Sequence, residues 1–338
     1  MKKTIGSADA LSESLATAST IQARSRMDLL SSAHRNPQEG ARPGAGIMSN
    51  LTSHALLSTD SLTLRNVHCG GECRHRSVEE CASSTQLVFP YRGLYMRHVG
   101  NDQVVADANH VLFFNAGEGY QVSHPLDGGD SCLSLSLDAA MLAELAPAAL
   151  MSPGERSVFR RQSQRIDARA QALVALLRHN LDNGTIEPLE AEALVLTLVC
   201  RSLGPRTSRE PTSTHARRRL ADRVKVLLAS DLSRRWTLAE IGREIGSSPV
   251  YLTQVFRQVE GMPLYRYQLQ LRLARSLDTI GRYDDLSALA AELGFSSHSH
   301  FAYAFRQAFG RSPTDFRRST QTHTAKESDS APPPVVVS

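Results

Sequence analysis

The spacing of apolar positions changes along the chain, and this change divides the sequence into regions of different secondary structure. From about residue 60 to residue 137, short apolar runs alternate with turn signals such as Gly100-Asn101-Asp102. Within 132–137 Leu alternates with Ser, which is the period of a strand. Short strands separated by Gly, Asn and Asp turns predict a small β-sandwich or barrel. The predicted strands span 85–89, 93–99, 103–106, 111–114, 120–123 and 132–137.

Helical periodicity replaces this pattern after residue 138. Apolar residues recur every three or four positions in 165–181 and 188–203, and a shorter helix is predicted over 139–150. The Leu and Val stripe of the two longer helices must be buried, but whether it packs within the chain or between two copies stays open. Residues 204–215, rich in Pro, Ser, Thr and Arg, are predicted to be an interdomain linker.

The two ends of the chain show no sustained period. Residues 1–55 are rich in Ser, Ala, Gly and Arg, and the last residues include a run of three prolines. Such compositions bury too little apolar surface to offset the entropy of ordering. We therefore predict a disordered extension over 1–55 and a disordered tail over 321–338.

The C-terminal third contains many signals for the start and end of helices. Thr237 and Glu240 fit a capping box that opens a helix ending near Gly246. Ser248-Pro249 opens the next helix, which runs to about residue 259. A helix, a short glycine turn and a second helix make a helix-turn-helix, and a basic helix over 216–230 precedes it. The apolar positions expected to share a core are Leu238, Ile241, Ile245, Leu252 and Phe256.

The same pattern recurs about 48 residues later. Asp285 opens a helix that closes at Gly294, and Ser297 can cap the following helix. The first helices of the two copies are offset by 48 residues and the second helices by 49, which places one extra residue near Phe295. A continuous helix predicted over 263–280 would hold both recognition helices at a fixed separation. Successive major grooves on one face of DNA require about 34 Å.

Charge supports a polyanionic partner for this region. Residues 216–320 hold 17 Arg and Lys against 10 Asp and Glu, so they carry +7, and the rest of the chain carries −3 of the total +4. A basic domain behind an acidic remainder is typical of nucleic-acid binding but does not prove it.

The candidate DNA contacts follow from the solvent-facing positions of the second helix in each unit. Uncharged side chains near the helix N-termini can read base edges and thymine methyl groups, whereas arginines at the far ends and N-cap serines suit phosphates. The predicted base readers are Val250, Thr253, Gln254, His298, Ser299, His300, Ala302 and Tyr303. The predicted backbone contacts are Ser248, Arg257, Ser297, Arg306 and Arg311.

Residues 216–320 resemble the AraC/XylS family of bacterial transcription regulators. The stretch from Gly294 to Phe305, followed by 309–317 with its Gly310-Arg311-Ser312-Pro313, carries the resemblance. It implies a multidomain α+β protein with a cupin-like β-barrel or sandwich regulatory domain over 56–203. An all-α DNA-binding domain with two helix-turn-helix units would span 216–320. Gly242 and Val250 depart from the family pattern, which leaves the DNA contacts of the first unit less defined than its fold.

The resemblance also implies partners. We expect a sequence-specific transcription regulator that binds double-stranded promoter DNA and contacts RNA polymerase, and that is not an enzyme. Its N-terminal domain would sense a small-molecule effector or form a homodimer. The effector, the operator and the sign of regulation stay open.

Several cysteines and histidines suggest metal or redox chemistry as an alternative. Cys69 and Cys73 form C-x3-C, not the stronger C-x2-C, and no second pair follows. His298 and His300 lie two residues apart, which splays them about 200° around a helix. The alternatives are a metal-dependent cupin enzyme, or a DNA-repair protein or redox sensor with a cysteine-held metal joined to the DNA-binding module. An architectural DNA binder without a sensing role is a further one. We assign no catalytic residue, no metal ligand and no cofactor.

The number and spacing of the cysteines and the hydropathy of the chain indicate in which cellular compartment the protein is located. Five cysteines at irregular spacing argue against a secreted disulfide framework. No apolar run approaches the roughly 18 residues of a membrane helix, and no apolar signal segment follows Lys2-Lys3. We expect a cytoplasmic protein with no membrane contact.

Overall fold

The computed structural model describes residues 51–71, 74–153, 155–204 and 214–321. All of them belong to one compact unit, Met48–Ser338. Most of the predicted extension, most of the linker and nearly all of the predicted tail lie outside the described residues. No helix in the described ranges is long and apolar enough to cross a membrane.

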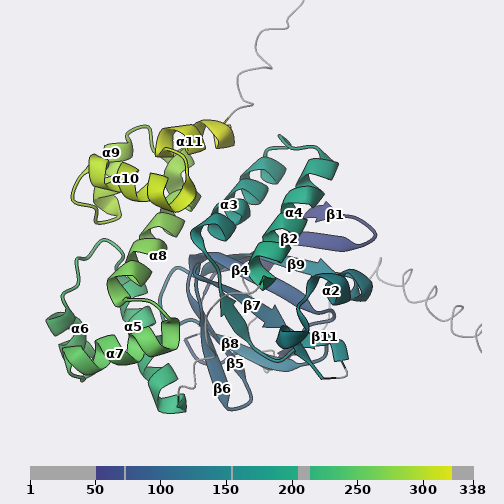
Figure 1. Cartoon of the computed structure of the whole chain (residues 1–338), viewed down its shortest axis with the longest axis horizontal. Coiled ribbons are helices and arrows are strands. Elements are labelled where there is room, and N and C mark those ends of the chain that lie inside the picture. The colour runs from purple at the N-terminus through teal and green to yellow at the C-terminus, as the bar shows by residue number, and fades with distance from the viewer. Residues whose placement is uncertain (1–50, 72–73, 154, 205–213, 322–338) are drawn as a thin grey trace, which may run out of the picture. The chain divides into compact units, whose positions relative to one another are not determined.

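Two antiparallel sheets face each other in the N-terminal half (Figure 1). The larger sheet has the strand order β1-β2-β9-β4-β7-β12, and the smaller has the order β3-β8-β5-β6. The larger sheet contains β1 (Leu51–Ser58), β2 (Leu62–Cys69), β4 (Gln86–Gly93), β7 (His110–Phe114), β9 (Asp130–Leu137) and β12 (Ser163–Arg165). The smaller contains β3 (Glu80–Cys81), β5 (Tyr95–Val99), β6 (Asp102–Ala106) and β8 (Gly119–Ser123). β10 (Met151–Ser152) and β11 (Glu155–Phe159) form a separate pair.

The predicted sandwich is confirmed, and within the described residues the sheets do not close into a barrel. All six predicted strands are present with small shifts at their ends. The prediction did not include β1, β2 or the shorter strands β3, β10, β11 and β12, and β1 overlaps the last residues of the predicted disordered extension. Most of β1 is exposed, so its sequence carries no alternation of apolar and polar positions that could reveal a strand.

Period-two alternation separates two cores on the opposite faces of the larger sheet. On β7, Val111 and Phe113 join the core beneath the helices, whereas Leu112 and Phe114 join the core between the sheets. β7 is therefore apolar throughout. On β9 the leucines of the Leu–Ser alternation face the helices, while Cys132 faces the smaller sheet.

Helices cover the outer face of the larger sheet. They are α2 (Ala139–Leu145), the short 3-10 turn η1 (Ala148–Leu150), α3 (Ala168–Asp182) and α4 (Pro188–Leu203). The predicted helix over 139–150 is interrupted at Pro147, which lacks an amide proton. α3 begins later than predicted because Asp167 caps it and 163–165 pair with β7. The apolar stripe of α3 and α4 packs within the chain, against the sheet core and the C-terminal helices.

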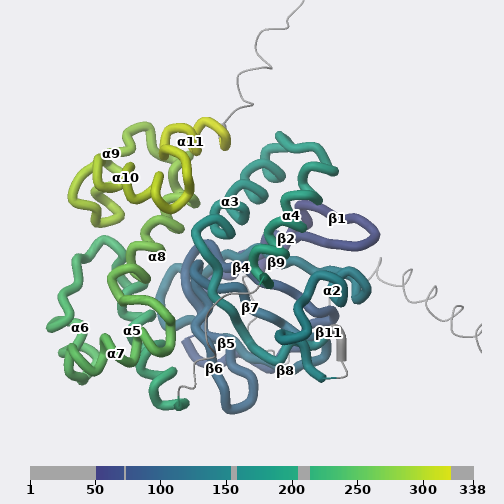
Figure 2. The backbone as a smooth tube through the Cα atoms, in the orientation of Figure 1, coloured from purple at the N-terminus to yellow at the C-terminus, as the bar shows by residue number. Residues whose placement is uncertain are grey.

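The C-terminal domain is all α (Figure 2). Its elements are α5 (His215–Ser230), α6 (Leu238–Ile245), α7 (Pro249–Glu260), α8 (Leu264–Thr279), the 3-10 turn η2 (Ile280–Arg282), α9 (Leu286–Glu292), α10 (His298–Phe309) and α11 (Pro313–Gln321). One apolar core holds α5, α6 and α7, and a second holds α9, α10 and α11. α8 contributes to both, as predicted for the connector. Leu238 is 44% exposed, so its assignment to the first core was wrong: as the first residue of α6 it lies outside the packed face.

Candidate nucleic-acid interface

The turn of the first helix-turn-helix unit depends on two glycines. Gly246 ends α6 with φ of 71°, a left-handed conformation in which a side chain would be strained. The Ser247 amide donates to the Gly242 carbonyl, and a Cβ on Gly242 would lie 2.8 Å from the Ser247 carbonyl oxygen. The departure from the family pattern at Gly242 is therefore a packing requirement of this tight turn. Ser248 then accepts a hydrogen bond from the Tyr251 amide and begins α7.

The second turn is built in the same way but holds one more residue. Gly294 has φ of 75°, and Ser297 accepts from the His300 amide to begin α10. Between them Phe295 is 5% exposed, and its ring packs 5.2 Å from that of Phe301. The extra residue expected near Phe295 thus enters the second core.

The N-terminal halves of α7 and α10 display the predicted base readers at the surface. Val250 is 68% exposed and Tyr303 67% exposed. The Thr253 hydroxyl donates to the Pro249 carbonyl, so its methyl group and the lone pairs of its oxygen are left for a ligand. The other exposed predicted readers are Gln254, His298, Ser299 and His300, while Ala302 is half-buried.

His300 is held differently from its neighbours. Its Nδ1 lies 3.1 Å from Ser296 Oγ, and its ring meets Phe295 edge-on. Together with Tyr303 it lines a cavity of about 530 Å³ that is also lined by residues of α3, α4 and α8. The base-reading role of His300 stays a prediction. Its position at the cavity is an alternative place for the side chain to act.

The predicted backbone contacts are all exposed. Arg257 and Arg306 are exposed in the last turns of α7 and α10, and Arg311 is exposed within hydrogen-bond distance of Ser319. Ser248 and Ser297 each accept an amide hydrogen bond. Because a hydroxyl can accept and donate together, each keeps its proton for a phosphate oxygen.

Sequence reasoning missed two features of this domain. One is Tyr251, which is 47% exposed beside Val250. The other is a set of buried polar side chains that joins the β domain to the first helix-turn-helix unit. The sequence does not indicate that these charged side chains are buried. They come from separate elements of the chain, and no sequence motif links them.

Glu260, the last residue of α7, is the centre of that buried set. Its carboxylate lies 2.6 Å from Lys225 Nζ of α5 and 3.4 Å from His110 Nε2 of β7. His110 Nδ1 lies 2.8 Å from Asp107, which also accepts the hydroxyl proton of Tyr267 from α8. We name these five residues the interdomain charge cluster; each is at most 6% exposed.

Opposite charges set the protonation of this cluster. Burial disfavours the charged form of Glu260, but Lys225 and His110 outweigh it and lower the pKa of Glu260 to about 2. Burial likewise opposes a charge on His110, but Asp107 outweighs it, so the pKa of His110 is raised. The pKa of Lys225 is also raised, mainly by Glu260 and Asp222 against desolvation. The shifts of Glu260, His110 and Lys225 all favour the charged form, whereas burial and the nearby carboxylates raise the pKa of Tyr267 and keep its hydroxyl protonated.

The raised pKa of His110 predicts a pH dependence of stability. A group with a raised pKa contributes fully below its unfolded value, about 6.5, and the contribution is lost as the pH rises through the folded value. The groups that face His110 are Asp107, Glu260 and the more distant Lys225. Urea unfolding over a pH series should show the full chain losing stability above pH ~6.5, and His110→Gln should flatten that slope. Equal slopes for both proteins would contradict this.

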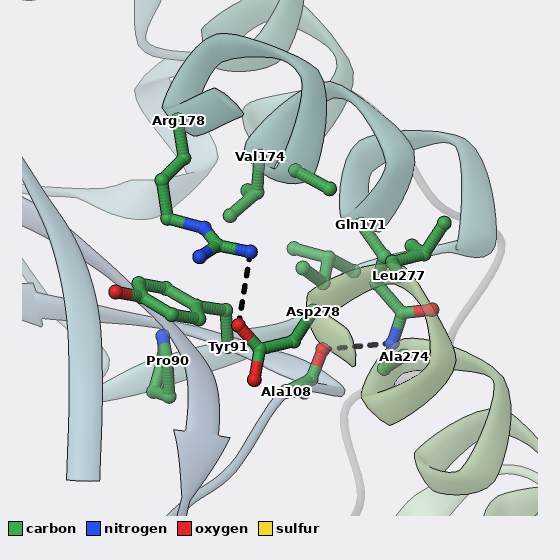
Figure 3. A pocket seen from close by; sticks show the side chains of 11 residues that line it. Pro90, Tyr91, Ala108, Gln171, Val174, Arg178, Ala274, Leu277 and Asp278 are labelled. Atoms are coloured by element: carbon green, nitrogen blue, oxygen red, sulfur yellow. Dashed lines mark hydrogen bonds and ion pairs between the residues drawn. The ribbon is translucent and has the colours of Figure 1, made fainter. Parts of the chain in front are cut away.

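A second ionic contact joins the domains around Asp278 of α8 (Figure 3). Its carboxylate lies 3.0 Å from Arg178 of α3, 3.0 Å from Arg92 of β4 and 2.7 Å from Arg275. Arg178 also stacks on the Tyr91 ring. The adjoining cavity of about 20 Å³ has room for about one water.

The metal question takes a new form in the structure. Cys73 lies outside the described residues, so the expected C-x3-C pair cannot be followed. Cys69 instead lies beside His124 and Asp130, both of which are far from it in the sequence. Burial would lower the pKa of His124, but hydrogen bonds with Asp130 and Cys69 raise it to about 9.

Comparison with known proteins finds relatives of the C-terminal domain. A family described as a helix-turn-helix domain matches residues 241–319. The HTH-type transcriptional regulator GadX of Escherichia coli O6:H1 is 33% identical over 101 residues, which cover 29% of this chain and 36% of GadX. The chain thus matches about a third of the length of that relative.

Two comparisons extend further along the chain. The probable transcriptional regulator LumQ of Photobacterium leiognathi is 27% identical over 249 residues, covering 70% of this chain and 92% of LumQ. The crystal structure of ToxT from Vibrio cholerae O395 is 9% identical and covers 78% of this chain and 100% of ToxT, with a TM-score of 0.31. A TM-score this low carries no argument about the fold.

Proposed function

We propose that the chain is a sequence-specific DNA-binding transcription regulator, because residues 241–319 match a helix-turn-helix domain, as the sequence predicted, and resemble an HTH-type transcriptional regulator. The observation that carries the proposal is the duplicated unit. α7 and α10 both begin after a glycine turn, are capped by serine, and expose uncharged side chains near their N-termini. The name of each relative above describes a transcription regulator.

The division of contacts follows from side-chain chemistry. Gln254 and His298 can hydrogen-bond base edges, and Val250 and Ala302 suit thymine methyl groups. Arg257, Arg306 and Arg311 neutralise phosphates and so supply affinity without sequence information. The preferred site is therefore not dominated by arginine–guanine pairs.

The proposal is tested by selecting DNA fragments with the full-length chain. Genomic fragments are mixed with the protein at moderate salt, and retained fragments are sequenced and confirmed by gel shift. We expect a small set of fragments sharing two half-sites about one helical turn apart. Retention of all fragments alike would contradict a sequence-specific regulator and favour an architectural DNA binder.

Substitutions separate base readers from backbone contacts. Gln254→Ala and His298→Ala should each reduce discrimination at one position of the site by about 1–3 kcal/mol. Arg306→Ala should weaken binding to all sequences and lower the salt slope by about 1. Gln258→Ala, at an exposed position near the far end of α7, is the matched control. A change of preference in Arg306→Ala without loss of affinity would contradict the assignment.

The β domain is proposed to regulate the DNA-binding domain. The interdomain charge cluster and the contacts of Asp278 tie the sheets and α3 to α5, α7 and α8. A signal that shifts the sandwich would move the first recognition helix through these contacts. A small-molecule effector, a homodimer and contact with RNA polymerase are part of the proposal, as are a regulatory domain ending at residue 203, a DNA-binding domain over 216–320 and a cytoplasmic location.

A further inference from the structure

Three side chains of metal-ligating types meet in the β domain, away from α7 and α10. One ligand atom from each of Cys69, His124 and Asp130 lies within 4.8 Å of the other two. His124 is 2% exposed and Asp130 6% exposed, while Cys69 is partly exposed. The DNA-binding function proposed above uses none of them.

The sheet register brings these residues together. β2 pairs with β9 so that Cys69 lies directly opposite Asp130, and side chains at such positions share one face with Cβ atoms about 5 Å apart. His124 follows β8 of the other sheet, and its Nε2 lies 2.7 Å from Asp130 Oδ1. The cluster is thus held by three strands from two sheets.

Two glycine turns press together beside the cluster. A Cβ on Gly129 would lie 2.0 Å from the Cys69 carbonyl oxygen, and one on Gly71 would lie 2.4 Å from Gly129 Cα. Both glycines have positive φ. Only glycine permits this approach, which keeps the end of β2 close to the end of the 124–130 segment.

The hydrogen bonding of the cluster is incomplete. His124 Nδ1 is buried and has no hydrogen-bond partner among the described residues, so no hydrogen bond at that nitrogen opposes a small rotation of the ring as Nε2 changes partner. The second carboxylate oxygen of Asp130 accepts from the Cys132 thiol at 3.2 Å. Outer hydrogen bonds of that kind orient ligating carboxylates in metal sites.

We propose that Cys69, His124 and Asp130 bind a Zn²⁺ ion. Thiolate, imidazole and carboxylate are the ligands zinc prefers, and three protein ligands leave a fourth position open. In tetrahedral zinc the nitrogen and oxygen ligands lie roughly 3.4 Å apart, so the 2.7 Å contact between His124 and Asp130 lengthens by well under 1 Å. Cys69 binds as thiolate and releases its proton to solvent.

The location connects the ion to the DNA-binding helices. Asp127, Gly128 and Gly129 line a cavity of about 270 Å³, whose lining also includes Leu232, which follows α5, and Leu271 and Arg275 of α8. An ion held by His124 and Asp130 ties down both ends of that loop. It therefore restrains one wall of the space between the two domains.

The test measures metal binding by the full-length chain. After treatment with a chelator and dialysis, the protein is titrated with Co²⁺, and Zn²⁺ is then added as competitor. We expect one equivalent of Co²⁺ with a thiolate charge-transfer band, displaced by one equivalent of Zn²⁺. Cys69→Ser should abolish the band, and His124→Gln and Asp130→Asn should each weaken Zn²⁺ binding at least about 10-fold.

Matched controls use residues of the same types outside the cluster. Cys81→Ser replaces an exposed cysteine, and His68→Gln replaces the exposed histidine next to Cys69; both should bind as the parent does. Circular dichroism checks that each variant folds, and the partly exposed Cys69 keeps the test valid if His124→Gln does not. The proposal is overturned if the parent binds no metal, if folded Cys69→Ser retains the band, or if the controls lose it equally.

Discussion

Glu260→Ala is expected to lower the free energy of unfolding by about 3–5 kcal/mol, because it leaves the buried ammonium group of Lys225 without its main partner. Lys225 is 6% exposed and lies 2.6 Å from the Glu260 carboxylate. In the variant it keeps Asp222 at 3.4 Å, whose own pKa is raised chiefly by burial. His110 loses the second of its two carboxylates. Urea unfolding of the full chain at neutral pH measures the loss.

A double variant separates the destabilisation caused by an unpaired buried charge from the stability that the intact ion pair contributes. Glu260→Met combined with Lys225→Met should recover part of the loss, since it removes both members of the closest ion pair and leaves Asp222, whose pKa burial already raises, without Lys225. Glu244→Ala, at an exposed position of α6, should change stability by no more than about 0.5 kcal/mol. A loss below about 1 kcal/mol in Glu260→Ala would show that water reaches the cluster and that it does not hold the domains together.

The pH profile provides an independent check on Glu260. Its pKa is lowered to about 2, so its contribution is present above the unfolded value, near 4.3, and is lost as the pH falls toward 2. Below that range the parent and Glu260→Ala should converge in stability. A constant difference down to the lowest pH would contradict the ion pair.

Phe305→Ala is the second large effect, expected to destabilise the second helix-turn-helix unit by about 3–5 kcal/mol. The Phe305 side chain is fully buried. Its ring meets those of Phe301, Phe309 and Phe316 at 5.7, 4.6 and 5.8 Å. Removing it opens a cavity among three aromatic neighbours that cannot collapse without moving α10 against α11. Hydrogen exchange of α10 amides, together with urea unfolding, measures the effect.

Tyr303 offers the matched control on the same helix. It is of similar size and 67% exposed, so Tyr303→Ala should change stability by no more than about 0.5 kcal/mol while altering DNA preference. Phe305→Leu should fall between the parent and Phe305→Ala, because it restores part of the lost volume. Equal destabilisation by the Tyr303 and Phe305 substitutions would contradict the assignment of the two faces of α10.

Local sequence signals predicted the structure correctly where a segment's conformation depends mainly on its own residues. The capping box at Thr237 and Glu240 is present with both reciprocal hydrogen bonds, and α4 and α6 begin and end where the sequence placed them. Capping and helical period act over a few residues, so they can be read without the fold. The same signals failed for β1, whose stability comes from pairing with β2 and not from its own pattern.

The sequence by itself determined the double helix-turn-helix, its connector and most of the solvent-facing positions of α7 and α10, because spacing, caps and glycines encode helices and their exposed sides locally. Only the tertiary structure decided that Glu260 is a buried partner of Lys225 and His110, although they come from three different elements. It also decided that Cys69 meets His124 and Asp130 and not a nearer histidine. Strand register and domain packing set such contacts. Both depend on burial summed over the whole chain, so the spacing of residues within one segment cannot predict them.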